Sequence, residues 1–154
     1  LLGFMIRPMP TAPKDTYKNI KEHQYFTVNA ISKSMIADAH HTSANYPPEV
    51  SEFENTNLEP EFLDDFKVPF VKGSPVRLLC KYLNEYDIAE NGCTHVIASI
   101  EKIYVEDELV QEDLSVRLDL GEIVTINGVD GYALPKLIDK FGYAHPYQPT
   151  KSVL

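Results

Sequence analysis

Two stretches in the middle of the chain alternate apolar and polar residues with the period of a β-strand. The first, "VRLLCKYLNEY" (residues 76–86), and the second, "THVIASIEKIYV" (residues 94–105), are separated by "IAENGC", which supplies turn residues. We predict a β-hairpin that turns around Ala89. Strict alternation assigns one face of each strand to the core; the predicted apolar face consists of Val76, Leu78, Cys80, Tyr82, Val96, Ala98 and Ile100.

Shorter elements precede this hairpin. "GFMIR" (residues 3–7) has the pattern of an apolar strand, and "YFTVNAI" (25–31) that of a strand rich in aromatic and β-branched residues. Between them, "DTYKNIKEH" (15–23) has the pattern of a short helix that Asp15 or Thr16 caps. A second helix is predicted to begin with Ser32 as its N-cap and to end near residues 40–41.

The remaining segments are less regular. Residues 42–73 combine prolines and acidic residues with isolated large apolar residues, which indicates a long excursion with short helical turns, one around residues 48–55. A polar hairpin or short helix is predicted after Asp107, followed by "IVTINGVDGYALP" (123–135) with two glycines and a proline. This order favours a strand-rich α+β chain, mainly β, with a barrel-like sheet and a few short helices.

Size and charge limit the possible partners. The 154 residues suffice for one domain, 1–154, and the net charge of -9 argues against nucleic acid, because a basic face is absent. No apolar run has the length of a membrane span, so we expect a soluble protein without a membrane partner. The chain opens directly on an apolar strand, and we expect N-terminal strands of the domain to be missing from the sequence given.

The two cysteines are predicted to stay unpaired. In the predicted hairpin Cys80 faces a residue near Ser99, whereas Cys93 lies close to the turn, so the two thiols are too far apart for a disulfide. Free thiols fit a reducing compartment, and we expect a cytoplasmic location. One core thiol and one loop thiol explain the pair without a catalytic role.

The stretch "RPMPTAPKDT" (residues 7–16) is a candidate anion site. A helix N-terminus offers unpaired backbone N–H groups and a partial positive charge, and here Arg7 and Lys14 flank it. A phosphate is the kind of anion that such a site would bind. The alternative is an ordinary surface helix capped by Asp15 with two solvated cations, and local spacing does not separate these interpretations.

Other reactive side chains form no recognisable catalytic motif. His40 and His41 are adjacent and point in different directions on a helix, so no metal site is expected there. His95, at the start of a strand, could contact a ligand or donate a proton, or could be a hydrogen-bonded structural histidine. No Gly-x-Ser-x-Gly motif and no glycine-rich phosphate loop is present, so hydrolase and nucleoside-triphosphatase functions have no support.

The order of the motifs resembles that of a known family. "GFMIRP…PKDTYKNIKEHQYFTVNAIS", "HTSANYPPEVSEFE", "SPVRLLCKYL", "THVIASIEKIYVED" and "GEIVTINGVDGYALPKL" together resemble the flavin reductase-like family of FMN-binding split barrels, which includes flavoredoxin. The resemblance runs through nearly the whole chain. It implies an FMN-binding split β-barrel fold, and it implies that the anion at the start of the first helix is the FMN phosphate.

Carried over residue by residue, the resemblance also implies site residues. Arg7, Lys14 and Thr16 would hold the phosphate, while Asp15 would order the helix start. A second group near the flavin would consist of Thr42, Ser43, Ala44, Asn45 and Tyr132. His95 matches the strand-start histidine of the family, near the reactive face, and is the candidate catalytic residue.

The implied function is an FMN-dependent oxidoreductase. It would be an NAD(P)H-dependent flavin reductase or a flavoredoxin-like electron carrier, with NADH or NADPH as electron donor and a small-molecule substrate or an electron-transfer partner as acceptor. The family resemblance implies a homodimer with flavin near the subunit interface. Two alternatives remain: a split barrel that binds FMN or another anionic ligand for storage or sensing without turnover, and a structural dimer whose site has decayed.

Overall fold

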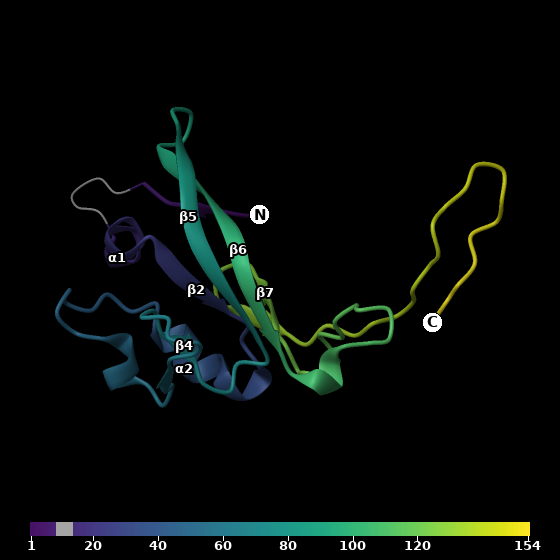
Figure 1. Ribbon diagram of the computed structural model, residues 1–154, viewed down its shortest axis with the longest axis horizontal. Helices are drawn as coiled ribbons and strands as arrows, with labels where there is room; N and C mark the ends of the chain where they lie inside the picture. The colour runs from purple at the N-terminus through teal and green to yellow at the C-terminus, as the bar shows by residue number, and fades with distance from the viewer. Residues whose placement is uncertain (9–13) are drawn as a thin grey trace.

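The computed structural model describes residues 1–8 and 14–154, and its centre is one antiparallel sheet (Figure 1). Four strands lie in the order β1-β6-β5-β2, namely β1 (Leu2–Ile6), β6 (Cys93–Val105), β5 (Val76–Ile88) and β2 (Tyr25–Asn29). Within the described residues this sheet stays open and does not close into a barrel. The predicted mainly β architecture with short helices is confirmed.

The long hairpin forms where the alternating pattern predicts it. β5 and β6 pair along their whole lengths, and the turn between them uses Gly92, whose φ of 67° is readily accessible only to glycine. Cys80 lies opposite Ile100, one residue from the Ser99 expected, and Cys93 begins β6 next to the turn. Both cysteines are free, as predicted.

Strict alternation along β5 is interrupted by two register shifts, one of them between Tyr82 and Asn84 and the other in the buried part of the strand. The pairing register shifts between Leu79 and Cys80, and both side chains are fully buried. Leu79 was predicted on the mixed face, but that face is covered here by the excursion, where Phe70 is fully buried and its ring lies 5.2 Å from that of Tyr104. A β-bulge and a covered second face therefore bury consecutive residues.

At the turn end of the hairpin the two faces of the sheet differ. Phe4 and Val96 are opposite each other on the packed face, where the Phe4 ring meets that of Phe26 at 5.5 Å. Met5 and His95 form the next pair and lie on the other face, where Met5 is 45% exposed. This end of the sheet is therefore packed on one side only.

The first helix, α1 (Asp15–His23), has the predicted bounds but a different start. Its N-cap is Lys14, which makes no side-chain cap hydrogen bond, and the Asp15 carboxylate accepts a hydrogen bond from Lys18 Nζ at 2.9 Å instead. The prediction that Asp15 or Thr16 caps the helix is wrong. Asp15 lies within the first turn, where its charge favours the positive end of the helix and its partner is on the next turn.

The second helix begins in two steps. Ser32 is the N-cap of a 3-10 turn, η1 (Lys33–Met35), which continues into α2 (Ile36–His41). The end near residues 40–41 is as predicted. The Ser32 hydroxyl lies 3.0 Å from that of Ser34 and caps no backbone group, so the hydroxyl does not act as the predicted cap acceptor.

The irregular parts of the chain contain only short elements. The excursion holds η2 (Glu52–Asn55), within the predicted helical turn, and the small hairpin β3 (Pro60–Glu61) with β4 (Phe70–Val71). After β6 come η3 (Asp107–Leu109) and a second small hairpin, β7 (Thr125–Asn127) with β8 (Gly131–Ala133). None of the helices in the described residues is long and apolar enough to cross a membrane.

Candidate functional site

The first helix is held against the hairpin by a cluster of polar side chains. Tyr17 Oη donates a hydrogen bond to Glu85 Oε1 at 2.8 Å, and Lys21 Nζ lies 3.2 Å from the same oxygen. Lys21 also donates to Tyr82 Oη at 2.9 Å. These contacts come from two turns of α1, so they fix both its position and its direction on β5.

The cluster shifts the protonation equilibria of its members. The hydrogen bond to Glu85 raises the pKa of Tyr17, since losing the phenolic proton would place two anions side by side. Burial disfavours the Glu85 carboxylate, but the Tyr17 hydroxyl and the Lys21 ammonium outweigh it, and the pKa of Glu85 is lowered. These shifts favour an ionised Glu85 and a neutral Tyr17 at neutral pH.

The predicted phosphate residues lie at the exposed end of α1. Lys14 and Thr16 are exposed at its first turn, and Arg7 is exposed just after β1. Pro8 lies beside the β5–β6 turn, 3.5 Å from where a Cβ on Gly92 would be. Residues 9–13, with two of the three prolines of the candidate anion stretch, lie outside the described residues. Lys14 thus lies at a helix start whose first N–H groups have no helical acceptor.

A groove of about 390 Å³ runs along one side of this helix. Thr16, Asn19 and His23 form its α1 side, as their spacing of three and four residues predicts for one helix face. The floor comes from β2 and the opposite wall from the excursion. The lining residues outside α1 are Tyr25, Phe26, Thr27, Asn29, Phe53, Lys67, Val68, Pro69 and Val71.

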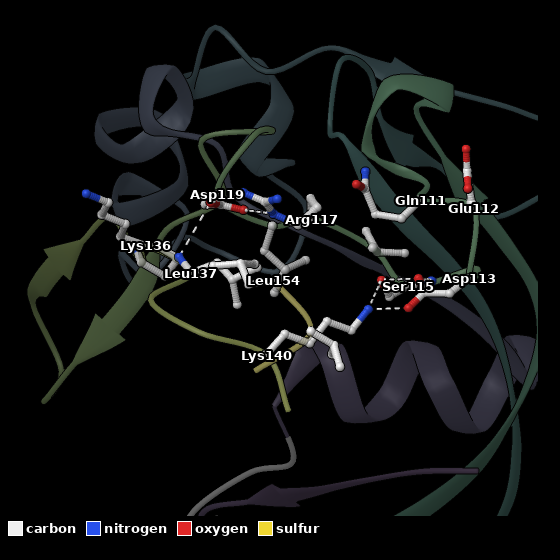
Figure 2. Close-up of a pocket in the computed structure, with 14 residues that line it drawn as sticks. Gln111, Glu112, Asp113, Ser115, Arg117, Asp119, Lys136, Leu137, Lys140 and Leu154 are labelled. Atoms are coloured by element: carbon white, nitrogen blue, oxygen red, sulfur yellow. Dashed lines mark hydrogen bonds and ion pairs between the residues drawn. The ribbon is translucent and has the colours of Figure 1, made fainter. Parts of the chain in front are cut away.

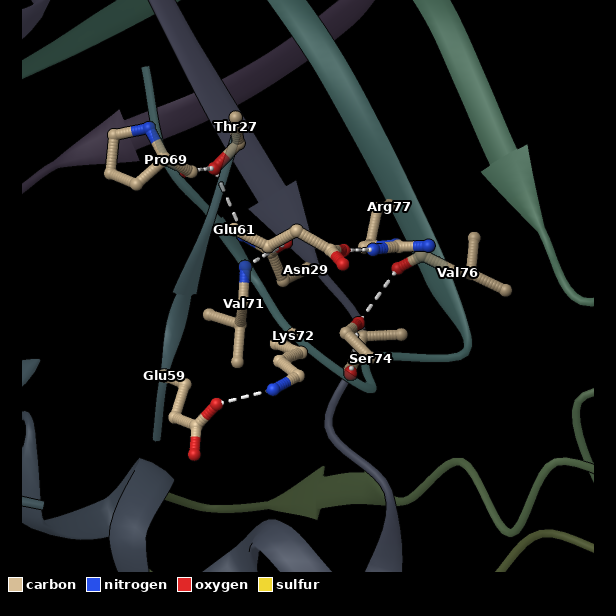
Figure 3. A network of polar contacts seen from close by, with 11 residues as sticks. Thr27, Asn29, Glu59, Glu61, Pro69, Val71, Lys72, Ser74, Val76 and Arg77 are labelled. Carbon is tan, nitrogen blue, oxygen red and sulfur yellow. Dashed lines mark hydrogen bonds and ion pairs between the residues drawn. The ribbon is translucent and has the colours of Figure 1, made fainter. Parts of the chain in front are cut away.

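Polar contacts with β2 fix the far wall of this groove (Figure 3). Thr27 Oγ1 donates to the Pro69 carbonyl at 2.7 Å, and Asn29 Oδ1 accepts from the Val71 backbone N–H at 3.0 Å. The excursion is thereby tied to the strand that follows α1. Because both walls are attached to the same strand, the groove is preformed in the fold.

Two cationic or ionisable side chains in the groove have no partner. Within the described residues, the His23 and Lys67 side chains make no hydrogen bond or ion pair. This sets them apart from most lysines of the chain, which reach a carboxylate, as Lys72 and Lys102 do. A groove with apolar rings and unpaired donors suits a flat, anionic ligand.

A second group of predicted residues surrounds the end of α2. Thr42 Oγ1 and Ser43 Oγ donate to carbonyls of the last helical turn, Ala39 at 2.8 Å and His40 at 2.7 Å. His40 Nδ1 lies 3.0 Å from Tyr132 Oη, which joins α2 to β8. The structure therefore brings residues 42–45 and Tyr132 together. His40, which the sequence suggested only as an unlikely metal ligand, makes the connection.

His95 lies far from the group at the end of α2 and, near α1, faces the other side of the sheet. It is on the face of β6 opposite the buried Val96, next to β1, and a Cβ on Gly3 would come within 2.7 Å of its Nε2 atom. On β5, His95 is paired with Tyr86, which is ten residues along the strand from Val76. The Val76 carbonyl accepts a hydrogen bond from the N–H of Ala30, in the segment that leads into α2. At about 3.3 Å per residue, about 30 Å of hairpin separates His95 from that end. One chain does not bring the predicted residues into a single site.

A second, more voluminous cavity lies elsewhere (Figure 2). It has a volume of about 850 Å³ and lies between residues 111–119 and the C-terminal segment; we call it the arm-root cavity. Two ion pairs line it, since Arg117 makes two hydrogen bonds of 2.8 Å to Asp119 and Lys140 contacts Asp113. Glu112 and Lys136 also line it and make no ion pair within the described residues. The Lys140 contact lowers the pKa of Asp113, and Arg117 lowers that of Asp119. No residue predicted for flavin lines this cavity.

The described residues contain no candidate metal-binding cluster. Across residues 1–8 and 14–154, no group of three or more His, Cys, Asp or Glu side chains is arranged to hold a metal ion. Cys80 is fully buried, and burial raises the pKa of its thiol. The groove beside α1 is the place where sequence-predicted residues and an open, preformed space coincide.

Comparison with known proteins identifies the family of the chain. The model of the flavin reductase like domain family matches residues 1–118. The chain belongs to this family. An uncharacterized protein of Aquifex aeolicus is 36% identical over 110 residues, covering 69% of this chain and 53% of that protein. A protein of Halalkalibacterium halodurans is 29% identical over 117 residues, covering 73% and 56%. The chain spans about half the length of these curated relatives.

Solved structures of the family share the fold. A split barrel protein of Shewanella frigidimarina, assigned as a flavin reductase, superposes with a TM-score of 0.87 at 38% identity, covering 92% of this chain and 70% of that one. Component B of nitrilotriacetate monooxygenase from Bacillus cereus gives 0.77 at 24%, with coverages of 92% and 70%. Flavoredoxin of Desulfovibrio vulgaris gives 0.71 at 16%, with 94% and 74%. The predicted split-barrel fold is confirmed.

Proposed function

We propose that this protein is an FMN-binding oxidoreductase, either an NAD(P)H-dependent flavin reductase or a flavoredoxin-like electron carrier. The observation that carries the proposal is the helix start of α1, with Lys14 at its N-cap, which opens into a preformed groove in a chain of the flavin reductase like family. FMN supplies hydride and electron transfer when bound, so no protein nucleophile is needed.

The chain's own residues would bind and orient the cofactor. Arg7 and Lys14 would neutralise the phosphate, while Thr16 and the first backbone N–H groups of α1 would donate hydrogen bonds to it. The aromatic and aliphatic side chains of the groove would take the apolar part of the ligand, next to the donors on Asn19 and Lys67. The Glu85 cluster would keep α1 in the orientation that this requires.

We propose further that the functional unit is a homodimer with flavin near the subunit interface. Residues 42–45 with Tyr132, and His95 on the opposite half of the hairpin, lie far from each other in one chain. A second copy would bring one of these groups to the groove of its partner. His95, on a sheet face left open in the single chain, remains the candidate catalytic residue.

The visible spectrum of the purified full-length protein, followed by titration with FMN, tests the proposal. Flavin bands, or saturable quenching of FMN fluorescence that Lys14→Ala weakens, would support it. A colourless protein that does not respond to FMN would contradict it.

A second experiment separates turnover from storage or sensing, which the same groove would also permit. FMN-loaded protein is mixed anaerobically with NADH and, separately, with NADPH. Bleaching of the flavin absorbance identifies an oxidoreductase and its donor. Tight FMN binding with no bleaching by either nucleotide would favour the storage or sensing function.

A further inference from the structure

The chain contains two Asn-Gly dipeptides, and each lies at the turn of a β-hairpin. Asn91-Gly92 is in the β5–β6 turn, and Asn127-Gly128 begins the β7–β8 turn. Both glycines have a positive φ, 67° and 74°, and all four residues are exposed. Asparagine is chemically labile when glycine follows it, because glycine has no Cβ to shield its backbone nitrogen. The two sites therefore invite a comparison of their reactivity.

The reaction in question is an attack within the chain. The glycine backbone nitrogen loses its proton and forms a bond to Cγ of the preceding asparagine, while the bond from Cγ to the side-chain nitrogen breaks and ammonia leaves. The product is a cyclic imide, which water opens to aspartate or isoaspartate. No oxidant, cofactor or enzyme is needed. The structure must leave the glycine N–H free to lose its proton and the asparagine side chain free to turn toward that nitrogen.

At Asn91 two hydrogen bonds oppose both requirements. Asn91 Oδ1 accepts from the Cys93 backbone N–H at 2.9 Å, which holds the side chain in place. The Gly92 N–H donates to the Ile88 carbonyl at 2.8 Å, which retains the proton that must leave. The turn also joins two long strands of the four-stranded sheet, so it does not open easily.

Asn127 lacks both constraints. Within the described residues its side chain makes no hydrogen bond, and the Gly128 N–H has no acceptor. β7 and β8 form a two-stranded sheet of their own, and every residue of β7 is exposed. Such a short hairpin is marginally stable, so local opening lets Cγ of Asn127 approach the Gly128 nitrogen.

A change at Asn127 would reach the group at the end of α2. Asn127 pairs with Gly131, the residue before Tyr132, and Tyr132 Oη lies 3.0 Å from His40 Nδ1. Isoaspartate carries the chain through its side-chain carbon and so lengthens the backbone at that residue. The pairing of β7 with β8 would then lose its register, and Tyr132 would move away from His40.

We propose that Asn127 is a site of spontaneous modification, at which the Gly128 nitrogen displaces ammonia and water then yields aspartate or isoaspartate, whereas Asn91 stays intact in the folded chain. The reaction adds a negative charge to the β7–β8 hairpin. Its isoaspartate product separates Tyr132 from His40. This inference does not depend on flavin binding.

Peptide mapping by mass spectrometry, after the folded full chain has been incubated at mildly alkaline pH, tests the proposal. The peptide with Asn127 should exchange its amide for an acid about tenfold faster than the peptide with Asn91, where two hydrogen bonds must first break. The rate should rise with pH, since the glycine nitrogen must lose a proton. Asp130, in the same turn, has no amide and cannot contribute to this mass change. Equal rates, or faster loss at Asn91, would overturn the proposal.

The same chain unfolded in urea is the matched control. Both dipeptides should then react at similar rates, because the hydrogen bonds that protect Asn91 are gone. A difference that persists after unfolding would mean that the neighbouring sequence, and not the fold, protects Asn91, and would contradict the proposal.

Nuclear magnetic resonance tests the effect on Tyr132. The imidazole signals of His40 should move in the fraction that contains isoaspartate. They should stay close to the wild-type positions in Asn127→Asp, which adds the charge and keeps the backbone length. Unmoved His40 signals in the isoaspartate fraction would contradict the separation of Tyr132 from His40.

Discussion

Two concave regions of this chain differ in what their charged side chains do. The groove beside α1 has a volume of about 390 Å³ and presents Lys67 and His23, which make no ion pair within the described residues. The arm-root cavity has about 850 Å³, but its Arg117 and Lys140 are bonded to carboxylates. The larger space is thus the one in which Arg117 and Lys140 are already neutralised, although its Lys136 makes no ion pair within the described residues.

This difference shows why size alone does not identify a ligand site. An anionic ligand in the arm-root cavity would have to compete with Asp113 and Asp119 for their partners, and it would leave those carboxylates unpaired. In the groove beside α1 the donors are available and the helix start adds a favourable partial charge. The groove, unlike the cavity, suits a small anion-bearing cofactor.

The largest effect is expected when the cations at the helix start are removed. Arg7→Ala/Lys14→Ala should weaken FMN binding about 100-fold, since a hydrogen bond to a charged group contributes about 1.5–3 kcal/mol. Fluorescence quenching of FMN measures the affinity. As a control, Lys136→Ala removes a cation that lines the arm-root cavity and should change the affinity less than about twofold, because the cavity plays no part in flavin binding. If both variants lost FMN affinity equally, the result would contradict the assignment of flavin to the groove beside α1 rather than to the arm-root cavity.

The sequence predicts the local elements of this fold well because their signals are local. The alternation of apolar and polar residues predicts the β5–β6 hairpin, and the spacing of apolar residues by three and four predicts α1 with its observed bounds. The burial of Leu79 next to Cys80 was not predictable, since it depends on a bulge and on the excursion that covers the second face. Those are contacts between residues far apart in the chain.

The candidate site shows the same limit. The motif at residues 14–16 marks the helix start, but the groove also needs Lys67, whose approach to α1 is set by the contacts of Thr27 and Asn29 with the excursion. No signal in the sequence pairs Lys67 with Asn19. The contact of His40 with Tyr132 was not predictable either, because it requires that β8 lie beside the end of α2.

A smaller effect should follow from removing the groove's own cation. Lys67→Gln should weaken FMN binding about three- to fivefold, because an exposed charge interaction is worth at most about 1 kcal/mol. Lys140→Gln is the matched control, since it removes a lysine that is already paired in the arm-root cavity. The affinity difference should shrink at high salt. A Lys67→Gln protein with wild-type affinity at low salt would place the flavin outside the groove.

The Glu85 cluster offers a subtler test, because it acts on the groove only by orienting α1. Glu85→Gln should weaken FMN binding about twofold to threefold, in line with the loss of one exposed or half-exposed ion pair. It should also lower the pKa of Tyr17, whose proton is retained by the neighbouring carboxylate. An ultraviolet difference titration of tyrosine between pH 8 and 12 measures this shift. Unchanged tyrosine titration would mean that Glu85 does not hold the helix through Tyr17.

The smallest effect is expected at the paired charges of the arm-root cavity, and its sign depends on pH. Lys140 lowers the folded-state pKa of Asp113, so the pair stabilises the folded state above the unfolded pKa of about 3.9 and loses this contribution as the pH falls below it. Lys140→Gln should therefore lower the melting temperature at pH 7 by no more than about 2 °C, since exposed pairs contribute little. The difference from wild type should shrink as the pH falls below that value and should vanish only below the lowered folded-state pKa of Asp113. A large loss at pH 7 would mean that Lys140 stabilises more of the folded chain than its exposed ion pair with Asp113 accounts for.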